Sequence, residues 1–281
     1  AAVAAARKLM PGNSPTPLTA GQLGALSILL ENLGLNAAAD EVFNQFAAVS
    51  SDGVIARAEF LGRAQRADES LDLLEAAWDK LPLERILRTA SAVLGSQATG
   101  ATTQQTERIN GWFEKARRQD PDSPSLALVF ADFIGATGTR EEMLAAYRAL
   151  LDRKDLSSQQ AAVAANNLAF HLAAPDTAAE AEELIARAIA ELGPQPDVLD
   201  TRGVVWLAAG KGQEAVADLQ EAVLVPTGPK YLHLASALAF QEQVEAARKA
   251  LAEAKKFGLV PGRLSKGDQD LLKSLEAMLG Q

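Results

Sequence analysis

The sequence predicts an all-α protein built as a row of about seven helical hairpins, and three observations lead to this prediction. Residues 160–259 divide into three consecutive segments, each with two short amphipathic helices joined by a small polar turn. In each segment a small residue of the first helix is followed twelve positions later by a small residue of the second helix: Ala169 and Ala181, Gly203 and Ala215, and Ala235 and Ala247. The composition, 48% hydrophobic but only 5% aromatic, favours close helix packing over a β-sandwich.

The spacing of these small residues has a known parallel. Their first members lie 34 and 32 residues apart, which follows from the positions 169, 203 and 235. A period of about 34 residues with this pattern resembles the tetratricopeptide repeat (TPR). The resemblance implies a right-handed α-solenoid over the whole of residues 1–281, because one hairpin alone exposes an apolar face that the next hairpin must cover.

One repeat shows why certain positions are restricted. Gly203 and Ala215 are expected to meet where the two helices cross, because a larger side chain would push the helix axes apart. Trp206 and Leu219 are expected to fill the space between this hairpin and the next. Gly210 lies near the end of the first helix, which a residue in the left-handed conformation can end at little cost.

The same spacing extends the repeats over residues 20–259. Residues 1–13 fit the second half of a repeat, so we expect a leading half-repeat and a chain that is a fragment of a longer protein. Four further hairpins are expected at about 20–50, 51–82, 83–121 and 124–156. The third has a polar turn at about Ser96–Gln105, which is expected to be a mobile loop.

A capping helix is expected at the C-terminus, over residues 263–281. Its apolar stripe consists of Leu271, Leu272, Leu275, Met278 and Leu279. Asp268 and Asp270 lie where acidic groups favour the start of a helix. This helix is expected to cover the exposed face of the last hairpin.

Composition excludes several classes of function. A net charge of −9, from 36 acidic and 27 basic residues, disfavours binding to nucleic acid or to an anionic membrane. The chain has no cysteine, so disulfides, thiolate metal sites and cysteine catalysis are excluded. No run reaches the roughly 18 apolar residues that a membrane span requires, so direct insertion into a membrane is not expected.

The candidate catalytic and metal-binding residues are few. Residues 95–100 have the glycine spacing of a phosphate-binding loop, but Ala101 stands where that loop needs lysine. The only histidines, His171 and His233, lie in different repeats and supply too few ligands for a metal site. Acidic pairs such as Glu141–Glu142 fit a solvated first turn of a helix better than acid–base catalysis. We therefore expect no enzyme activity, no metal and no cofactor.

The TPR resemblance also implies a concave groove, lined by the first helix of each repeat, where family members often hold an extended peptide or a helix. The positions of this chain that match the groove are Leu128, Asp132, Asn166, Asn167, Phe170, Asp200, Val204, His233, Ser236 and Phe240. Asn167 resembles the groove asparagine that hydrogen-bonds a bound main chain, and the alternative is that it only bridges neighbouring helices.

The polarity of the groove restricts the partner. TPR domains that grip the carboxylate tail of a chaperone use lysines and an arginine there, whereas the matching positions of this chain hold Asn166, Asp200 and Leu232. A neutral, apolar or basic segment is therefore favoured as the ligand.

The sequence thus predicts a non-enzymatic module that binds a protein or peptide partner in its groove. Two alternatives stay open: a structural scaffold that acts through its edges and self-association, and a regulatory region of a larger enzyme. The succession NNLA, LDTRG and YLHLA is similar to that of bacterial multi-repeat proteins, some of them in envelope and exopolysaccharide assembly. A bacterial source is expected, and the compartment, cytoplasmic or periplasmic, stays open.

Overall fold

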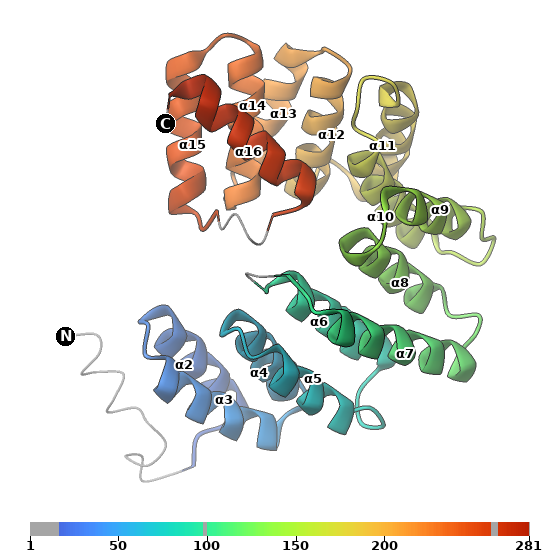
Figure 1. Cartoon of the computed structure of the whole chain (residues 1–281), viewed down its shortest axis with the longest axis vertical. Helices are drawn as coiled ribbons and strands as arrows, with labels where there is room; N and C mark the ends of the chain where they lie inside the picture. The colour runs from blue at the N-terminus through green and yellow to red at the C-terminus, as the bar shows by residue number, and fades with distance from the viewer. Residues whose placement is uncertain (1–16, 98–99, 260–263, 281) are drawn as a thin grey trace. The chain divides into compact units, whose positions relative to one another are not determined.

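The computed structural model describes residues 17–97, 100–259 and 264–280, and over these ranges it contains fifteen helices and no strand (Figure 1). The predicted all-α class is confirmed. The half-repeat predicted over residues 1–13 lies outside the described residues. The chain divides into two compact units, Ala1–Pro121 and Asp122–Gln281, and each is described by itself. The continuity of one solenoid across both units stays a prediction.

The first unit contains three of the predicted hairpins. They are formed by α2 (Ala20–Asn32) with α3 (Asn36–Val49), α4 (Ser51–Arg63) with α5 (Ala67–Ala76), and α6 (Leu83–Gly95) with α7 (Thr103–Gln119). Each pair begins and ends within a few residues of its predicted repeat. The periodic spacing of small and apolar residues was therefore sufficient to locate the helices of this unit.

The polar turn of the third hairpin is shorter than predicted. The sequence assigned Ser96–Gln105 to a loop, but α7 begins at Thr103. The Thr102 hydroxyl accepts a hydrogen bond from the Gln105 backbone, and the Gln105 side chain accepts one from the Thr102 backbone at 3.1 Å. This reciprocal capping satisfies two free N–H groups of the helix start, so polar residues that indicated a loop belong to the helix instead.

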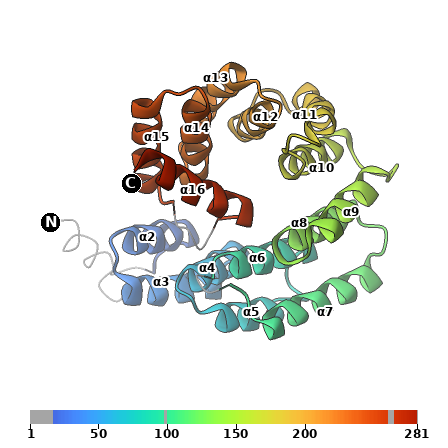
Figure 2. The same ribbon diagram turned by 45° about the horizontal axis from the view of Figure 1, so that its top comes forward.

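The second unit contains the other four hairpins and one more helix. The hairpins are α8 (Pro124–Thr137) with α9 (Arg140–Leu151), α10 (Ser158–His171) with α11 (Ala178–Leu192), α12 (Pro196–Ala208) with α13 (Gly212–Ala222), and α14 (Gly228–Phe240) with α15 (Val244–Lys256). The last helix, α16 (Lys266–Leu279), crosses α14 and α15 (Figure 2). The seven predicted hairpins are therefore all present in the described part of the chain.

Small residues lie where the two helices of a hairpin cross, as predicted. Ala169 and Ala181 are fully buried, and so are Ala235 and Ala247. A Cβ atom added to Gly203 would lie 2.4 Å from Cγ of Leu219, well inside van der Waals contact. The absence of a side chain at Gly203 thus allows α12 and α13 to approach closely.

Helix α16 covers the last hairpin through one apolar face. Leu272, Leu275 and Leu279 are buried in the same core cluster as residues of α14 and α15. Met278, which the sequence placed in this stripe, is instead 67% exposed. It lies at the edge of the stripe, on the side away from Leu272, so the buried face is narrower than predicted.

Four turns between paired helices place a residue at positive φ, seven positions after the small residue of the first helix. Two of these residues are glycines, Gly34 and Gly210, with φ of 70° and 75°. The other two are Gln65 and Glu242, with φ of 63° and 57°. A side chain in this left-handed region costs roughly 1–2 kcal/mol, so two turns of the protein are strained.

Relief of this strain gives a first prediction. Glu242→Gly is expected to raise the free energy of unfolding by about 0.5–1 kcal/mol, because the lost strain exceeds the greater freedom of glycine in the unfolded chain. Urea denaturation followed by circular dichroism measures the change. Lys249→Gly, at an exposed helical position of α15, is the control and should lower stability by about 1 kcal/mol. A loss of stability in Glu242→Gly would contradict the prediction.

Candidate functional site

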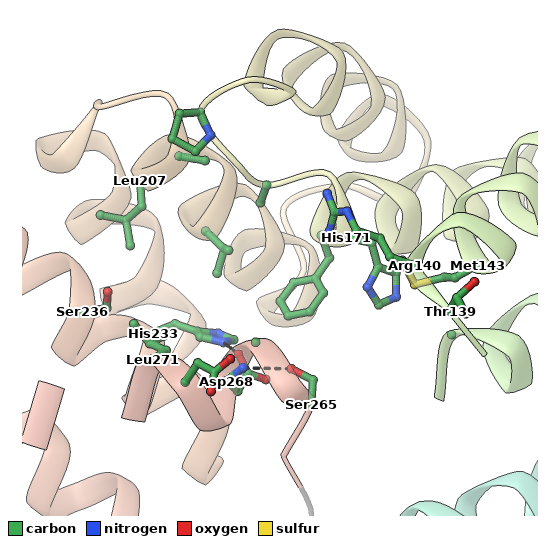
Figure 3. Close-up of a pocket in the computed structure, with 18 of the residues that line it drawn as sticks. Thr139, Arg140, Met143, His171, Leu207, His233, Ser236, Ser265, Asp268 and Leu271 are labelled. Carbon is green, nitrogen blue, oxygen red and sulfur yellow. Dashed lines mark hydrogen bonds and ion pairs between the residues drawn. The ribbon is translucent and has the colours of Figure 1, made fainter. Parts of the chain in front are cut away.

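An open groove with a volume of about 830 Å³ lies within the second unit. Its walls come from the first helices α8, α10, α12 and α14, from the start of α9 and from the first two turns of α16 (Figure 3). Most of its surface is apolar and is supplied by Met143, Phe170, Val204, Leu207, Ala208 and Leu271. The groove therefore follows the face that the first helices of the repeats were predicted to line.

A buried histidine joins three helices at one wall of this groove. The His233 side chain, on α14, is only 3% exposed. Its Nδ1 lies 2.9 Å from Oδ1 of Asp200 on α12, and its Nε2 lies 3.1 Å from Oδ1 of Asp268 on α16. Because both ring nitrogens face carboxylate oxygens, the doubly protonated imidazolium fits this arrangement best.

The protonation of His233 follows from these neighbours. Burial by itself disfavours the charged ring, but the two carboxylates outweigh it and raise the pKa of His233 from 6.5 to about 10. Burial acts against the charged form of Asp268 as well, yet the hydrogen bond to His233 holds its pKa below 3.8. At neutral pH the site thus holds one cation between two anions, and this ion triad fastens the start of α16 to the repeats.

A second polar chain connects α8, α9 and α10. The Tyr147 hydroxyl donates a hydrogen bond of 2.7 Å to Oδ1 of Asp132. The side-chain amide of Asn167 donates to the same oxygen at 3.0 Å, and Asn166 donates to Oδ1 of Asn167 at 3.2 Å. Burial, and then the charge of Asp132, raises the pKa of Tyr147. These contacts favour the interpretation of Asn167 as a bridge between neighbouring helices.

The wall formed by α9 and α10 carries a cation and a neutral ring. Arg140 is exposed at the first position of α9, and within the described ranges no carboxylate forms an ion pair with it. Burial, and then the charge of Arg140, lowers the pKa of His171 below 6.5, so His171 is neutral at pH 7. The His171 ring lies 5.7 Å from that of Tyr147 and 5.6 Å from that of Phe170.

The structure gathers four of the ten sequence-predicted residues along the groove: Phe170, Val204, His233 and Ser236. Asp200 lies beside them, as a partner of His233. The other five lie elsewhere: Leu128 is in the apolar core, Asp132, Asn166 and Asn167 form the polar chain, and Phe240 is 55% exposed and packs against Gly212.

Sequence reasoning missed several groove residues that come from other elements. Arg140 and Met143 belong to the second helix of a hairpin, whereas the family pattern places the groove on first helices. Asp268 and Leu271 belong to α16, where Asp268 was expected only to favour the start of the helix and Leu271 only to cover the last hairpin. Asp268 does take part in capping, because its backbone N–H donates to the Ser265 hydroxyl at 3.1 Å.

In the part of the chain that the structure describes, no group of three or more His, Asp and Glu side chains is arranged to hold a metal ion. Of the described helices, none combines the length and the apolar character that crossing a membrane requires.

Comparison with known proteins identifies the fold. No protein-family model matches the sequence, and no curated protein matches it. Among solved structures, a tetratricopeptide repeat protein from Parabacteroides merdae is similar with a TM-score of 0.56 at 15% identity, over 91% of this chain and 98% of that one.

Two other structures show the same likeness. One is the APC/C hetero-tetramer Cut9–Hcn1, with a TM-score of 0.53 at 14% identity, over 90% of this chain but only 59% of that one. The other is PilW, a widely conserved type IV pilus biogenesis factor, with a TM-score of 0.53 at 16% identity, over 80% of this chain and 97% of that one. The predicted TPR-type repeat fold is confirmed.

Proposed function

We propose that this TPR-type repeat protein is a non-enzymatic binding module that holds a segment of a partner protein in the groove of its second unit. The observation that carries the proposal is the open apolar groove, with Phe170, Val204, Leu207 and Leu271 on its walls. Its volume of about 830 Å³ is in the range of grooves that enclose a specific ligand. Burial of apolar side chains there supplies the affinity, at about 25 cal/mol per Å² removed from water.

Polar groups on the walls suit a bound main chain. In the described residues, the Ser236 hydroxyl and the ring nitrogens of His171 have no hydrogen-bond partner, and both side chains line the groove. Each can bond a peptide N–H or C=O group. Asn167 already donates to Asp132, so these two residues take the role that the family resemblance assigned to the asparagine.

One of the similar structures, the Cut9–Hcn1 hetero-tetramer, is consistent with a protein partner. Cut9–Hcn1 is a hetero-tetramer, and PilW is a pilus biogenesis factor. Identities of 14% and 16% limit the comparison to the fold. The groove of this chain therefore supplies the argument for binding, and the Cut9–Hcn1 hetero-tetramer adds only that such a fold occurs in a protein complex.

A peptide selection tests the proposal. A random 12-residue peptide library displayed on phage is selected on the full chain, and the affinities of enriched peptides are measured by calorimetry. Val204→Lys is expected to weaken them about 30-fold, because an unpaired charge in a desolvated apolar site costs about 2 kcal/mol or more.

The control is Val244→Lys, which makes the same change at a 42% exposed position of α15 outside the groove. It should leave the affinities unchanged. Circular dichroism confirms that both variants are folded. If the enriched peptides bind the wild type and Val204→Lys equally, or if no peptide is enriched, the groove is not the binding site.

A further inference from the structure

The groove of the second unit has opposite charges on two facing walls. Figure 3 shows Arg140 and His171 together on one side and Asp268 with Ser265 on another. Arg140 stands at the N-terminus of α9, where the helix dipole makes a positive charge unfavourable. No described carboxylate forms an ion pair with Arg140, and Glu141 and Glu142, which follow it in the same turn, do not line the groove. Arg140 is therefore the charged side chain that this wall presents to the groove.

The wall formed by α16 is negative. The ion triad of Asp200, His233 and Asp268 holds one positive and two negative charges and therefore has a net charge of −1. Asp270 also lines the groove; its side chain is 67% exposed, and its nearest described cation is Lys273 at 4.0 Å, the limit of an ion pair. The triad and Asp270 thus make this wall attractive to a cation.

The apolar floor between these walls separates the two charges. Phe170, Val204 and Leu207 line the groove together with both walls. Arg140 forms no ion pair with Asp268 or Asp270, although all three line the same groove. A ligand that fills the floor can therefore reach both walls at once.

We infer that the preferred occupant is a bipolar protein segment, with an acidic side chain at one end, a basic side chain at the other, and apolar residues between them. This inference rests on the proposed function and specifies its ligand. The acidic group pairs with Arg140, beside the neutral ring of His171, and the basic group pairs with Asp270 and the net negative triad. A uniformly acidic segment would be repelled at α16, and a uniformly basic one at Arg140.

This inference refines the partner chemistry predicted from sequence. A neutral, apolar or basic segment was favoured because only residues of first helices were considered. Asp270 still favours a basic group in the ligand, and the apolar floor still favours apolar residues. Arg140, which begins a second helix, adds the requirement for an acidic group.

Four synthetic peptides test the inference. All share the apolar core of the tightest peptide from the phage selection, and they differ in the flanking residues: Asp and Lys, Lys and Lys, Asp and Asp, or Ser and Ser. With the full chain at low salt, the Asp/Lys peptide is expected to bind about fivefold more tightly than either like-charged peptide. The difference should vanish at 1 M salt.

Charge-reversal variants assign each end to its wall. Arg140→Glu should shift the preference to the Lys/Lys peptide, and Asp270→Lys should shift it to the Asp/Asp peptide. Arg187→Glu and Glu183→Lys make the same charge changes at exposed positions of α11 that do not line the groove. These two controls should keep the wild-type preference.

The outcomes separate the inference from the function on which it rests. If the four peptides bind the wild type equally, or if the reversals leave the preference unchanged, the bipolar ligand is wrong while the groove remains the binding site. If no peptide is enriched in the selection, or if the enriched peptides bind Val204→Lys as tightly as the wild type, the proposed function fails and the inference with it.

Discussion

Replacement of His233 by glutamine is expected to lower the free energy of unfolding by about 3 kcal/mol or more at pH 6. The substitution removes the cation that lies between Asp200 and Asp268 and leaves two partly buried carboxylates close to each other. Removal of one partner of a buried ion pair costs about 3–5 kcal/mol, because the charge that remains is uncompensated. Urea denaturation followed by circular dichroism measures the loss.

The same site predicts how stability depends on pH. The pKa of His233 is raised from 6.5 to about 10 on folding, so its stabilisation is fully present below pH 6.5 and is lost as the pH rises towards 10. The slope is at most about 1.4 kcal/mol per pH unit. The pKa of Asp268 is lowered, so its contribution is present above pH 3.8 and is lost as the pH falls through its folded-state value. The triad is therefore strongest between about pH 4 and 6.5.

His171 provides the matched control for this pH dependence. Its pKa is lowered on folding, so well above pH 6.5 it is neutral in both the folded and the unfolded state, and it contributes almost no slope between about pH 7.5 and 10. His171→Gln should therefore keep the alkaline decline of the wild type, whereas His233→Gln should reduce it. A wild-type stability that stays flat from pH 6.5 to 10, or an unchanged slope in His233→Gln, would show that His233 is not held as an imidazolium.

The fold could be predicted from the sequence because its determinants are local and periodic. Two small residues twelve positions apart determine which two helices pair and how closely their axes approach. This pattern is repeated along the chain. Gly203 illustrates this, because its role at the crossing depends only on the hairpin that contains it. Where a local signal was ambiguous, as for the glutamines near Thr102, the expected loop was too long.

The candidate site was only partly predictable because several of its contacts join separate elements. Asp268 was predicted to be an acid in the first turn of a helix, and the structure places it there. Its contact with His233, 35 residues earlier, depends on where the capping helix crosses the repeats, which no local pattern encodes. Arg140 was missed for a similar reason, since its contribution arises from the way α9 begins beside the groove.

Gly203→Val is expected to be the second severely destabilising change and to lower the free energy of unfolding by about 3 kcal/mol. The new Cβ would lie 2.4 Å from Cγ and 2.9 Å from Cδ2 of Leu219, which is itself fully buried. Cγ is the branch point of the leucine, so a rotation of its end cannot relieve the overlap. The helices α12 and α13 must then move apart, and overpacking of this kind costs about 1–3 kcal/mol or more.

The control places the same change where there is room. A Cβ atom at Gly111, on α7, would meet nothing within 4 Å, so Gly111→Val should alter stability by less than about 0.5 kcal/mol. Shortening the opposing side chain tests the mechanism. Leu219→Ala alone should cost about 2–5 kcal/mol through the cavity that it creates, but much less in the Gly203→Val background, where the valine fills that cavity. If the losses of unfolding free energy are strictly additive in the double variant, Leu219 is not the reason why position 203 must be small.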